Sequence, residues 1–454
     1  MKWIGVILLL LLLHSANGQL NFKTLRYDED YGNLEADSSR DWYKRTKFCA
    51  LSKDRNTYIS FGGDIRYQYF RISNEKWGDE AKDKDGYLFS RVLVHGDLHL
   101  GNHFRVFSQL QGSMANGKPS TSPVDGDPLE LHQAFAEVKF GVDSRKKWLL
   151  RVGRQELAYG SQRLIAVRDG PNNRQSFDAA KLSLISTQYH ADLFYTNYVR
   201  AKKGLFNDHF NTDIRCWGAY VTRTNLPVIQ NIDLYYLGLW KKKTPFNDGA
   251  GSELRHSVGA RLFSRPRPLR YDIEMLYQFG NFGYKHIRAW TLSFNTGYQF
   301  QQAKLKPELG LKTELISGDK LVGDNKLQTF NPLFPRGGYF GLASLIGPSN
   351  LFDIHPSFGL SLNKRLQVNM DADIFWRFSK ADGIYGPNVA LIYSGNNNPY
   401  TKIGSQLAAD LNYTPNPYLY FRLEFTWFDA GDFLKAAGTG KDILFGGVTA
   451  QVKF

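Results

Sequence analysis

Apolar and polar residues alternate along most of this chain, and the segment from Leu366 to Phe378 shows the pattern most clearly. Every second position there is apolar. The positions between them hold polar or charged residues, and Phe375 is the one exception. Alternate residues of a β-strand point to opposite faces. The segment therefore predicts a strand with one apolar face and one charged face.

The same pattern predicts about eighteen strands in succession. They are expected at residues 58–70, 87–100, 103–113, 130–141, 147–156, 177–187, 189–199, 215–225, 231–241, 254–264, 270–280, 286–300, 305–316, 356–363, 366–379, 401–414, 417–429 and 442–454. No helical pattern between them offers a second apolar layer that would cover the apolar faces. We therefore expect an all-β fold, a transmembrane antiparallel β-barrel over residues 58–454, apolar outside and wet inside.

The segments between the predicted strands sort by length. Those after even-numbered strands are short, whereas those after odd-numbered strands are mostly long: 71–86, 114–129, 157–176, 200–214, 242–253, 317–355, 380–400 and 430–441, with 281–285 as a short exception. Outer-membrane barrels have short periplasmic turns and long extracellular loops. The sorting predicts that arrangement, with both termini in the periplasm, and a barrel of about eighteen strands leaves an aqueous channel.

The first residues predict export. Lys2 precedes an apolar run from Ile7 to Leu13 and a stretch of mostly small residues from Ser15 to Gly18. This is typical of a secretory signal peptide, here residues 1–18, and the run is too short to span a membrane. Residues 19–57 follow no clear period and are interpreted as a periplasmic lead-in or a small plug-like segment. The expected location is the outer membrane of a Gram-negative cell.

The formal net charge is +14 and the sequence pI is about 9.4. A basic pore for an acidic solute fits this charge, and so do rim and loop cations that meet the phosphates of lipopolysaccharide. Nucleic acid is not expected as a partner, because the aromatic residues follow the strand period. Neither a cofactor nor a metal is expected: Cys49 and Cys216 lie far apart, and CxxC and HExxH motifs are absent from the sequence.

The strand period also assigns the inward side chains. The basic candidates are Arg66, Arg91, Arg105, Lys139, Arg151, Lys181, Arg255, Arg261, Lys306, Lys312, Arg377 and Arg422. The acidic candidates are Asp64, Asp97, Glu137, Asp192, Asp272, Glu274, Glu308, Glu314, Asp371, Asp373 and Glu424. The two sets nearly cancel, so a structural ladder of cross-strand ion pairs is an alternative to an anion-binding wall.

An arginine-rich segment begins in the fifth predicted strand, 147–156, and continues through the loop that follows it. Five arginines lie between positions 151 and 174: Arg151, Arg154, Arg163, Arg168 and Arg174. Guanidinium groups bind carboxylates bidentately and stay charged at any working pH. Folded into the channel, these arginines would form a carboxylate-selective constriction. With Arg66, Arg91, Arg105 and Arg261 of the wall they are the candidate substrate-binding residues; the alternative is an ordered loop whose arginines pair with Glu156, Asp169 and Asp178.

The 317–355 segment is long enough to have a function of its own. Its apolar residues Phe330, Leu333, Phe334 and Leu345 indicate a self-packed lid or an inward fold. Asp319 and Asp324 have the chemistry to hold a calcium ion, but exposed turn carboxylates are the favoured interpretation because the spacing is not that of an EF-hand.

These two loops carry a family resemblance. Residues 151–178 contain RVGRQELAYGSQRL and VRDGPNNRQSFD, which resemble the signature of the alginate-export family of outer-membrane barrels. TFNPLFPRGGY at 329–339 and LIGPSNL at 345–351 resemble that family's second recurring segment. The resemblance implies a monomeric barrel whose arginine-rich constriction conducts an acidic polysaccharide such as alginate. By motif match, Arg151, Arg154, Arg163 and Arg174 are the residues carried over.

The leading functional hypothesis is a passive outer-membrane channel that conducts an anionic solute, such as an acidic polysaccharide or oligosaccharide of the alginate type, through the arginine-rich constriction. The first alternative is a general or small-anion porin, and the next is a structural barrel whose arginines are all paired with carboxylates. An enzymatic barrel would need a Ser/His/acid set. His95 and His99 share one strand face, but Ser90 has the opposite parity, so no enzyme is expected.

Overall fold

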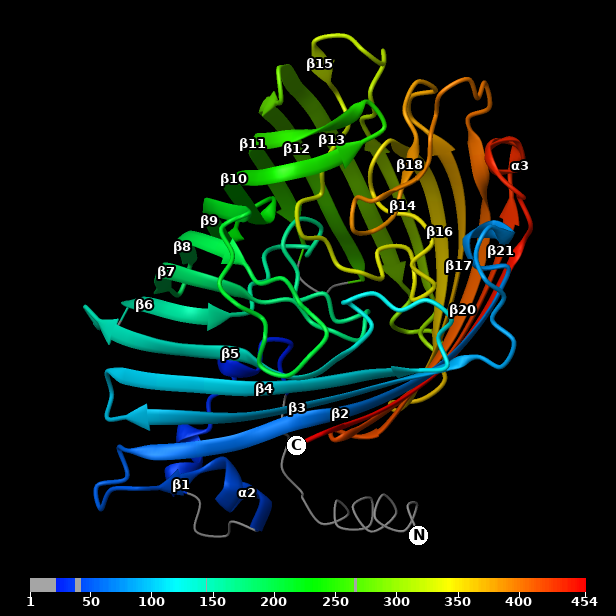
Figure 1. Cartoon of the computed structure of the whole chain (residues 1–454). Coiled ribbons are helices and arrows are strands. Elements are labelled where there is room, and N and C mark those ends of the chain that lie inside the picture. Colours follow the sequence, from blue (N-terminus) through cyan, green and yellow to red (C-terminus); the bar gives the residue numbers. More distant parts are fainter. Residues whose placement is uncertain (1–21, 37–41, 144, 265–267) are drawn as a thin grey trace.

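The computed structural model describes residues 22–36, 42–143, 145–264 and 268–454, so the predicted signal peptide at 1–18 lies outside the described residues. Long antiparallel strands surround a central space (Figure 1). They are β2 (Tyr58–Ser73), β3 (Tyr87–Leu100), β4 (Phe104–Asn116), β5 (Asp127–Phe140), β6 (Lys146–Gln155), β7 (Phe177–Ser186), β8 (Tyr189–Tyr198), β9 (Ile214–Leu226), β10 (Gln230–Phe246), β11 (Gly249–Phe263), β12 (Leu269–Phe282), β13 (Lys285–Gln299), β14 (Glu308–Ile316), β16 (Leu351–Ser361), β17 (Leu366–Arg377), β20 (Lys402–Asn416), β21 (Leu419–Ala430) and β22 (Ile443–Lys453).

The sheet closes on itself. The first long strand, β2, pairs with β3 on one side and with the last strand, β22, on the other, from Asp64 opposite Lys453 to Ser73 opposite Leu444. Closure pairs the backbone of both edge strands, which is what a strand in lipid requires. The predicted all-β fold, a closed antiparallel barrel of eighteen long strands, is confirmed.

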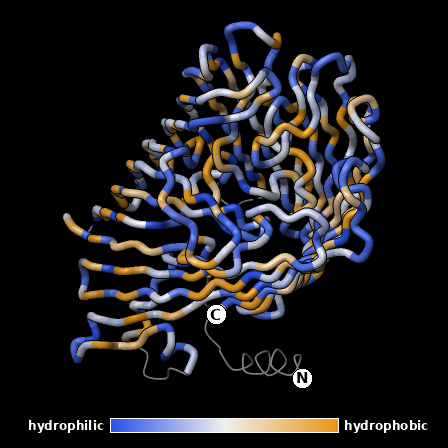
Figure 2. Tube along the Cα trace, in the orientation of Figure 1, coloured by the Kyte–Doolittle hydropathy of each residue, from blue (hydrophilic) through white to orange (hydrophobic). Residues whose placement is uncertain are grey.

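The strand period places the two faces as predicted. On β3, Val92 and Val94 are exposed on the outside, whereas Arg91, Leu93 and His95 are buried on the inside. Apolar and polar positions alternate along the strands in Figure 2. An apolar exterior around a polar interior is the pattern of an outer-membrane barrel.

Long loops gather at one end of the barrel and short turns at the other, as expected. The prediction of a loop at 242–253 is wrong, because β10 and β11 continue to Phe246 and from Gly249. The lysines and glycines of that stretch are typical of a loop in sequence, but the pairing of β10 with β11 continues through them to Phe246 opposite Gly249. β16 also starts at Leu351, five residues before its predicted start.

The remaining elements are short. They are the helices α2 (Trp42–Lys47) and α3 (Asp432–Ala437), the 3-10 turns η2 (Arg26–Asp28), η3 (Gly32–Ala36) and η4 (Glu75–Gly78), and the strands β1 (Cys49–Ala50), β15 (Lys326–Leu327), β18 (Ile384–Tyr385) and β19 (Leu391–Tyr393). Among the described residues, none of the helices has the length and apolarity to cross a membrane. Cys49 and Cys216 are both free.

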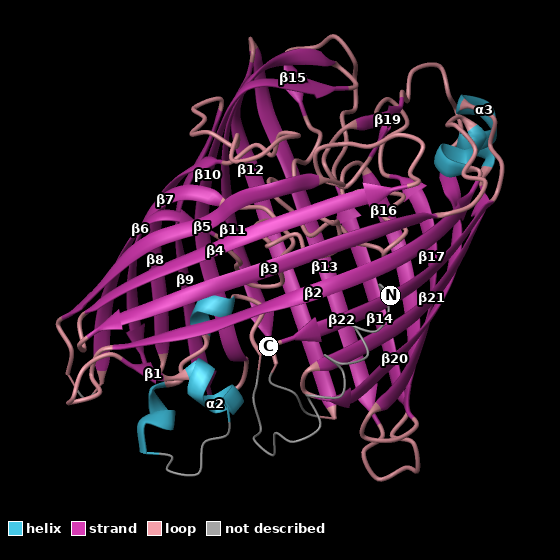
Figure 3. Cartoon of the chain, turned by 60° about the horizontal axis from the view of Figure 1, so that its bottom comes forward, coloured by secondary structure: helices cyan, strands magenta, loops and turns pink. Residues whose placement is uncertain are grey.

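The N-terminal segment enters the barrel from the short-turn end, where α2 and β1 lie (Figure 3). The Arg26 guanidinium donates hydrogen bonds to the carbonyl oxygens of Gly63 (2.8 Å) and Phe454 (2.9 Å). Tyr27 is buried edge-on against Phe107 and Phe135 of the inner wall. The part of the segment around Arg26 and Tyr27 therefore lies against the inner wall at this end.

Candidate functional site

Two long loops fold into the barrel and join there. The 156–176 loop connects β6 to β7, and the 317–350 loop connects β14 to β16. Ile165 and Phe334 form a parallel β-bridge, in which the Ala166 amide donates to the Phe334 carbonyl (3.0 Å) and the Phe334 amide donates to the Leu164 carbonyl (2.8 Å). The Phe334 ring also packs against Phe177 and Tyr198. The two loops thus form a single unit, called here the loop unit, inside the lumen.

Three arginines converge on one carboxylate of the 156–176 loop. Arg91 of β3 donates to Asp169 Oδ1 at 2.8 Å, and nitrogens of Arg174 and Arg66 lie 3.5 Å and 3.9 Å from the same oxygen. The arginine side chains are almost fully buried, whereas the Asp169 side chain is 49% exposed. We call Arg66, Arg91, Arg174 and Asp169 the Asp169 cluster.

Electrostatics favour the ionised form of Asp169. Enclosure within the barrel raises the pKa of this carboxyl, but Arg91, Arg174 and Arg66 outweigh that effect and hold the pKa well below its usual range. Arg66 also donates to the carbonyl oxygens of Asp169 (2.5 Å) and Pro171 (2.8 Å), so the wall fixes the loop backbone as well. The cluster is a built site for a carboxylate.

Arg174 connects the Asp169 cluster to the N-terminal segment. Its guanidinium lies 2.7 Å from Glu156 Oε1 and donates to the Thr24 carbonyl at 2.8 Å. Glu156 Oε1 also lies 2.8 Å from His132 Nε2. The Arg174 side chain therefore links the N-terminal segment, the 156–176 loop and the barrel wall.

Arg163 anchors the opposite side of the loop. Its Nη1 lies 3.5 Å from Glu314 of β14 and 3.8 Å from Glu274 of β12, and the neighbouring Ser161 hydroxyl donates to Glu274 at 2.8 Å. The loop therefore reaches from β2 and β3 to β12 and β14. The cavity that Arg163 lines there has a volume of about 10 Å³, room for one water at most.

The other candidate arginines lie apart from the Asp169 cluster. Arg105 pairs with Asp97 at 2.7 Å and Arg151 with Glu137 at 2.5 Å, both beside Tyr27. Arg154 pairs with Asp178 (2.9 Å), and Arg261 pairs with Asp272 (2.6 Å) and Asp233 (2.9 Å). Arg168 donates to the Tyr198 hydroxyl at 3.1 Å and has no ion pair within the described ranges. The pairs of Arg154 with Asp178 and of Arg174 with Glu156 and Asp169 are those that the ordered-loop alternative anticipated.

Water-accessible pockets lie at both ends of the lumen. One of about 430 Å³ at the long-loop end is lined by residues that include Lys76, Trp77, Lys118 and Leu345. Another of about 490 Å³ at the short-turn end is lined by residues that include Tyr27, Arg105 and Arg151. The loop unit lies between the two ends, and Asp169 is the exposed member of the Asp169 cluster.

Some parts of this site are not visible in the sequence pattern. The sequence predicts Asp169 as a partner for arginines of its own loop, whereas the structure also pairs it with Arg66 and Arg91 of the wall. Thr24 and Tyr27 have no periodic signal at all. Asp319, expected to be exposed, is buried and accepts from the Gln328 amide, whereas Asp324 caps the Lys326 amide in a turn.

The profile of the alginate export family matches residues 57–442, most of the chain and nearly all of the barrel. The chain belongs to the alginate export family. The family and the barrel fold described above indicate a channel for solute passage in the outer membrane. No curated protein matches the sequence.

Solved structures with the same fold are outer-membrane proteins of Pseudomonas. OpdO of Pseudomonas aeruginosa is 11% identical, with a TM-score of 0.56 over 87% of this chain and 97% of that one. A BenF-like porin from Pseudomonas fluorescens Pf-5 is 8% identical, with a TM-score of 0.57 over 87% and 98% of the two chains. Pseudomonas aeruginosa OccK2 (OpdF), solved in complex with glucuronate, is 9% identical, with a TM-score of 0.55 over 87% and 98%. At such identities the likeness shows the fold alone.

Proposed function

We propose that this family member is a passive outer-membrane channel for an anionic solute, and that the solute passes the Asp169 cluster. The main support for this proposal is that the three buried arginines of the cluster bind the carboxylate of Asp169, whose side chain is half exposed. A site that binds the carboxylate of Asp169 has the chemistry to bind the carboxylate of a solute. Because the Asp169 side chain is half exposed, its carboxylate has room to turn away from the arginines as a solute carboxylate arrives, while the loop backbone stays held by Arg66.

The proposed solute class is an acidic saccharide. A uronic acid carries one carboxylate per sugar ring, so successive carboxylates can move from one arginine to the next. Arg105 and Arg151 at the short-turn pocket, with Arg154, Arg163, Arg168 and Arg261, would supply weaker sites along the lumen. Several weak sites let a solute both enter and leave. The family's name and the glucuronate bound by OccK2 support this class for the present chain.

The charge of the rest of the molecule fits the same proposal. The net charge of +14 exceeds what the nearly balanced wall supplies, so it comes mainly from rim, turns and loops. There it would attract anionic solutes and contact the phosphates of lipopolysaccharide. We propose that the barrel acts as a monomer, since its own sheet is closed.

The second candidate function is a structural barrel with a closed lumen. The observation that favours it is the pairing of Arg151, Arg154, Arg163 and Arg174 with carboxylates of the wall and the loops. Fully paired arginines leave no excess positive charge for a solute. The two candidates differ in whether the purified protein conducts anions.

The test is a current recording in planar bilayers with an oligouronate and a neutral oligosaccharide of equal length. We expect anion-selective current that the oligouronate blocks and the neutral oligosaccharide leaves unchanged. A large current that neither saccharide changes would indicate a general porin, whereas the absence of current would favour the structural barrel.

A further inference from the structure

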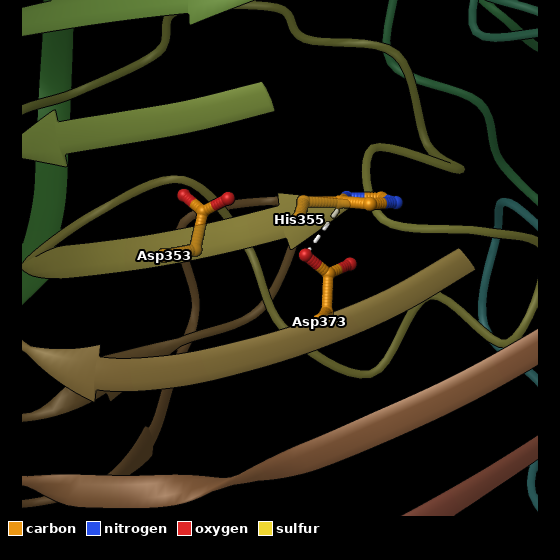
Figure 4. A group of neighbouring side chains, drawn as sticks. All are labelled: Asp353, His355 and Asp373. Atoms are coloured by element: carbon orange, nitrogen blue, oxygen red, sulfur yellow. Dashed lines mark ion pairs between the residues drawn. The ribbon is translucent and has the colours of Figure 1, made fainter. Parts of the chain in front are cut away.

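We propose that Asp353, His355 and Asp373 form a binding site for a divalent transition-metal ion in the barrel wall, on the inner face of β16 and β17. Asp353 and His355 project from β16, and Asp373 projects from β17 (Figure 4). One potential ligand atom from each residue lies within 4.8 Å of the others. This site goes beyond the proposed channel function.

The carboxylates of this group are buried without hydrogen-bond partners. Asp353 and Asp373 are both 0% exposed, and neither oxygen of either carboxylate has a hydrogen-bond partner among the described residues. Burial of an ionised carboxylate is strongly unfavourable unless a cation or hydrogen-bond donors compensate its charge. The two buried carboxylates of Asp353 and Asp373 therefore need a nearby positive charge.

Neighbouring cations supply only part of this compensation. Lys312 and Arg163 lie 3.0 Å and 3.5 Å from Glu314, the residue opposite Asp353 in the sheet, so they compensate Glu314. In the described part of the chain, the carboxylates of Asp353, Asp371 and Asp373 form no ion pair with lysine or arginine. His355 and Lys312, which lies opposite His355 in the sheet, both act on these carboxylates, but Lys312 is shared with Glu314. The carboxylates of Glu314, Asp353, Asp371 and Asp373 therefore outnumber the cations Lys312, Arg163 and His355, and a local negative charge is left over.

The contact between His355 and Asp373 resembles that of two ligands on one ion. His355 Nδ1 lies 2.8 Å from Asp373 Oδ1, yet both atoms lack hydrogen-bond geometry. Two ligand atoms on a shared small cation lie roughly 2.9–3.4 Å apart. The other nitrogen of His355, Nε2, lies 3.2 Å from the carboxylate of Asp371. In metal sites, the second ring nitrogen of a histidine ligand is commonly oriented by such a carboxylate.

The ligand chemistry selects the class of metal. One imidazole and two carboxylates suit Zn²⁺ and related first-row ions, whereas Ca²⁺ takes six to eight oxygen ligands, typically. An entry route exists, because His355 and Asp371 line a pocket of about 260 Å³ near the short-turn end. A bound ion would neutralise the site and join β16 to β17.

The test uses the full chain folded in detergent, treated with EDTA and then titrated with ZnCl₂ by equilibrium dialysis. We expect about one zinc ion per chain, with little competition from Ca²⁺. Asp353→Asn, His355→Gln and Asp373→Asn should each weaken binding by more than about 100-fold, whereas Asp371→Asn should weaken it by about 10-fold, as for an outer partner. His99→Gln, which removes the histidine of a comparable pair with Asp97 (3.2 Å), is the matched control and should bind as the unchanged chain does.

The proposal is overturned if the unchanged chain binds no zinc, or if Asp353→Asn and Asp373→Asn bind it normally. Circular dichroism reports whether each variant folds. If these variants do not fold, X-ray absorption of the zinc-loaded unchanged chain decides. Nitrogen and oxygen neighbours with an imidazole signature support the site, whereas sulfur or an all-oxygen shell overturns it.

Discussion

Ile165 and Phe334, which belong to different loops, form a parallel β-bridge inside the barrel. The bridge joins the loop that carries Asp169 to the loop that reaches β20 and β21, where Gln406 donates to the Phe340 carbonyl and the Leu342 amide donates to Glu424. Movement of one loop therefore involves the other. We expect the loop unit to set how wide the lumen can open.

Replacing Phe334 by alanine should loosen the loop unit. The ring contacts Phe177 edge-on and stacks on Tyr198, and loss of a buried phenylalanine costs about 3–5 kcal/mol in packed sites. We expect a higher single-channel conductance and faster proteolysis within 317–350. Phe300→Ala, at an exposed residue of the short-turn end, is the control. Conductance equal to that of the unchanged chain would show that the loop unit does not limit the pore.

Arg163→Gln should release the far end of the 156–176 loop. It leaves Glu274 and Glu314 with less positive charge, and breaking a buried ion pair costs about 3–5 kcal/mol. Hydrogen exchange should rise in residues 156–166, while Arg163→Lys, which keeps the charge, should show a smaller rise. The idea of an anchor fails if exchange there does not change in Arg163→Gln.

The N-terminal segment should bind the barrel wall more strongly as the pH rises, because Lys47 is buried against β2 only when the segment is docked there. Its ammonium group donates to the Phe61 carbonyl at 2.9 Å. Burial and then Arg26 lower the pKa of Lys47 from its ordinary 10.5 to about 7, although Glu29 acts in the opposite direction. Between these two values the undocked segment binds more protons than the docked one, so docking gains free energy as the pH rises from about 7 to 10.5.

Limited proteolysis within residues 42–57 measures this docking. Cleavage should slow as the pH rises through that window, after correction for the protease's own pH dependence on an unfolded substrate. Lys47→Met should remove most of the effect. A cleavage rate that is independent of pH in the unchanged chain would contradict the role of Lys47.

The strand period predicted the barrel and the inward face of Arg66, Arg91, Arg105, Arg151 and Arg261, because burial of one face in lipid fixes side-chain parity. Loop positions have no such constraint, so the strand period could not predict that Asp169 pairs with Arg66 and Arg91 of the wall. The sequence analysis did not predict the group of Asp353, His355 and Asp373, because the predicted strand 356–363 begins after Asp353 and His355. The D-x-H and D-x-D spacings at 353–355 and 371–373 were the available signal.

The reversal potential of Asp169→Asn under a KCl gradient tests the central claim most directly. Removing this carboxylate frees Arg66, Arg91 and Arg174 from their shared partner, so one more positive charge faces the lumen. The account predicts that the reversal potential shifts toward that of chloride and that an oligouronate blocks the variant at lower concentration than the unchanged chain. An unchanged reversal potential, or a shift toward potassium, would contradict a solute path past the Asp169 cluster.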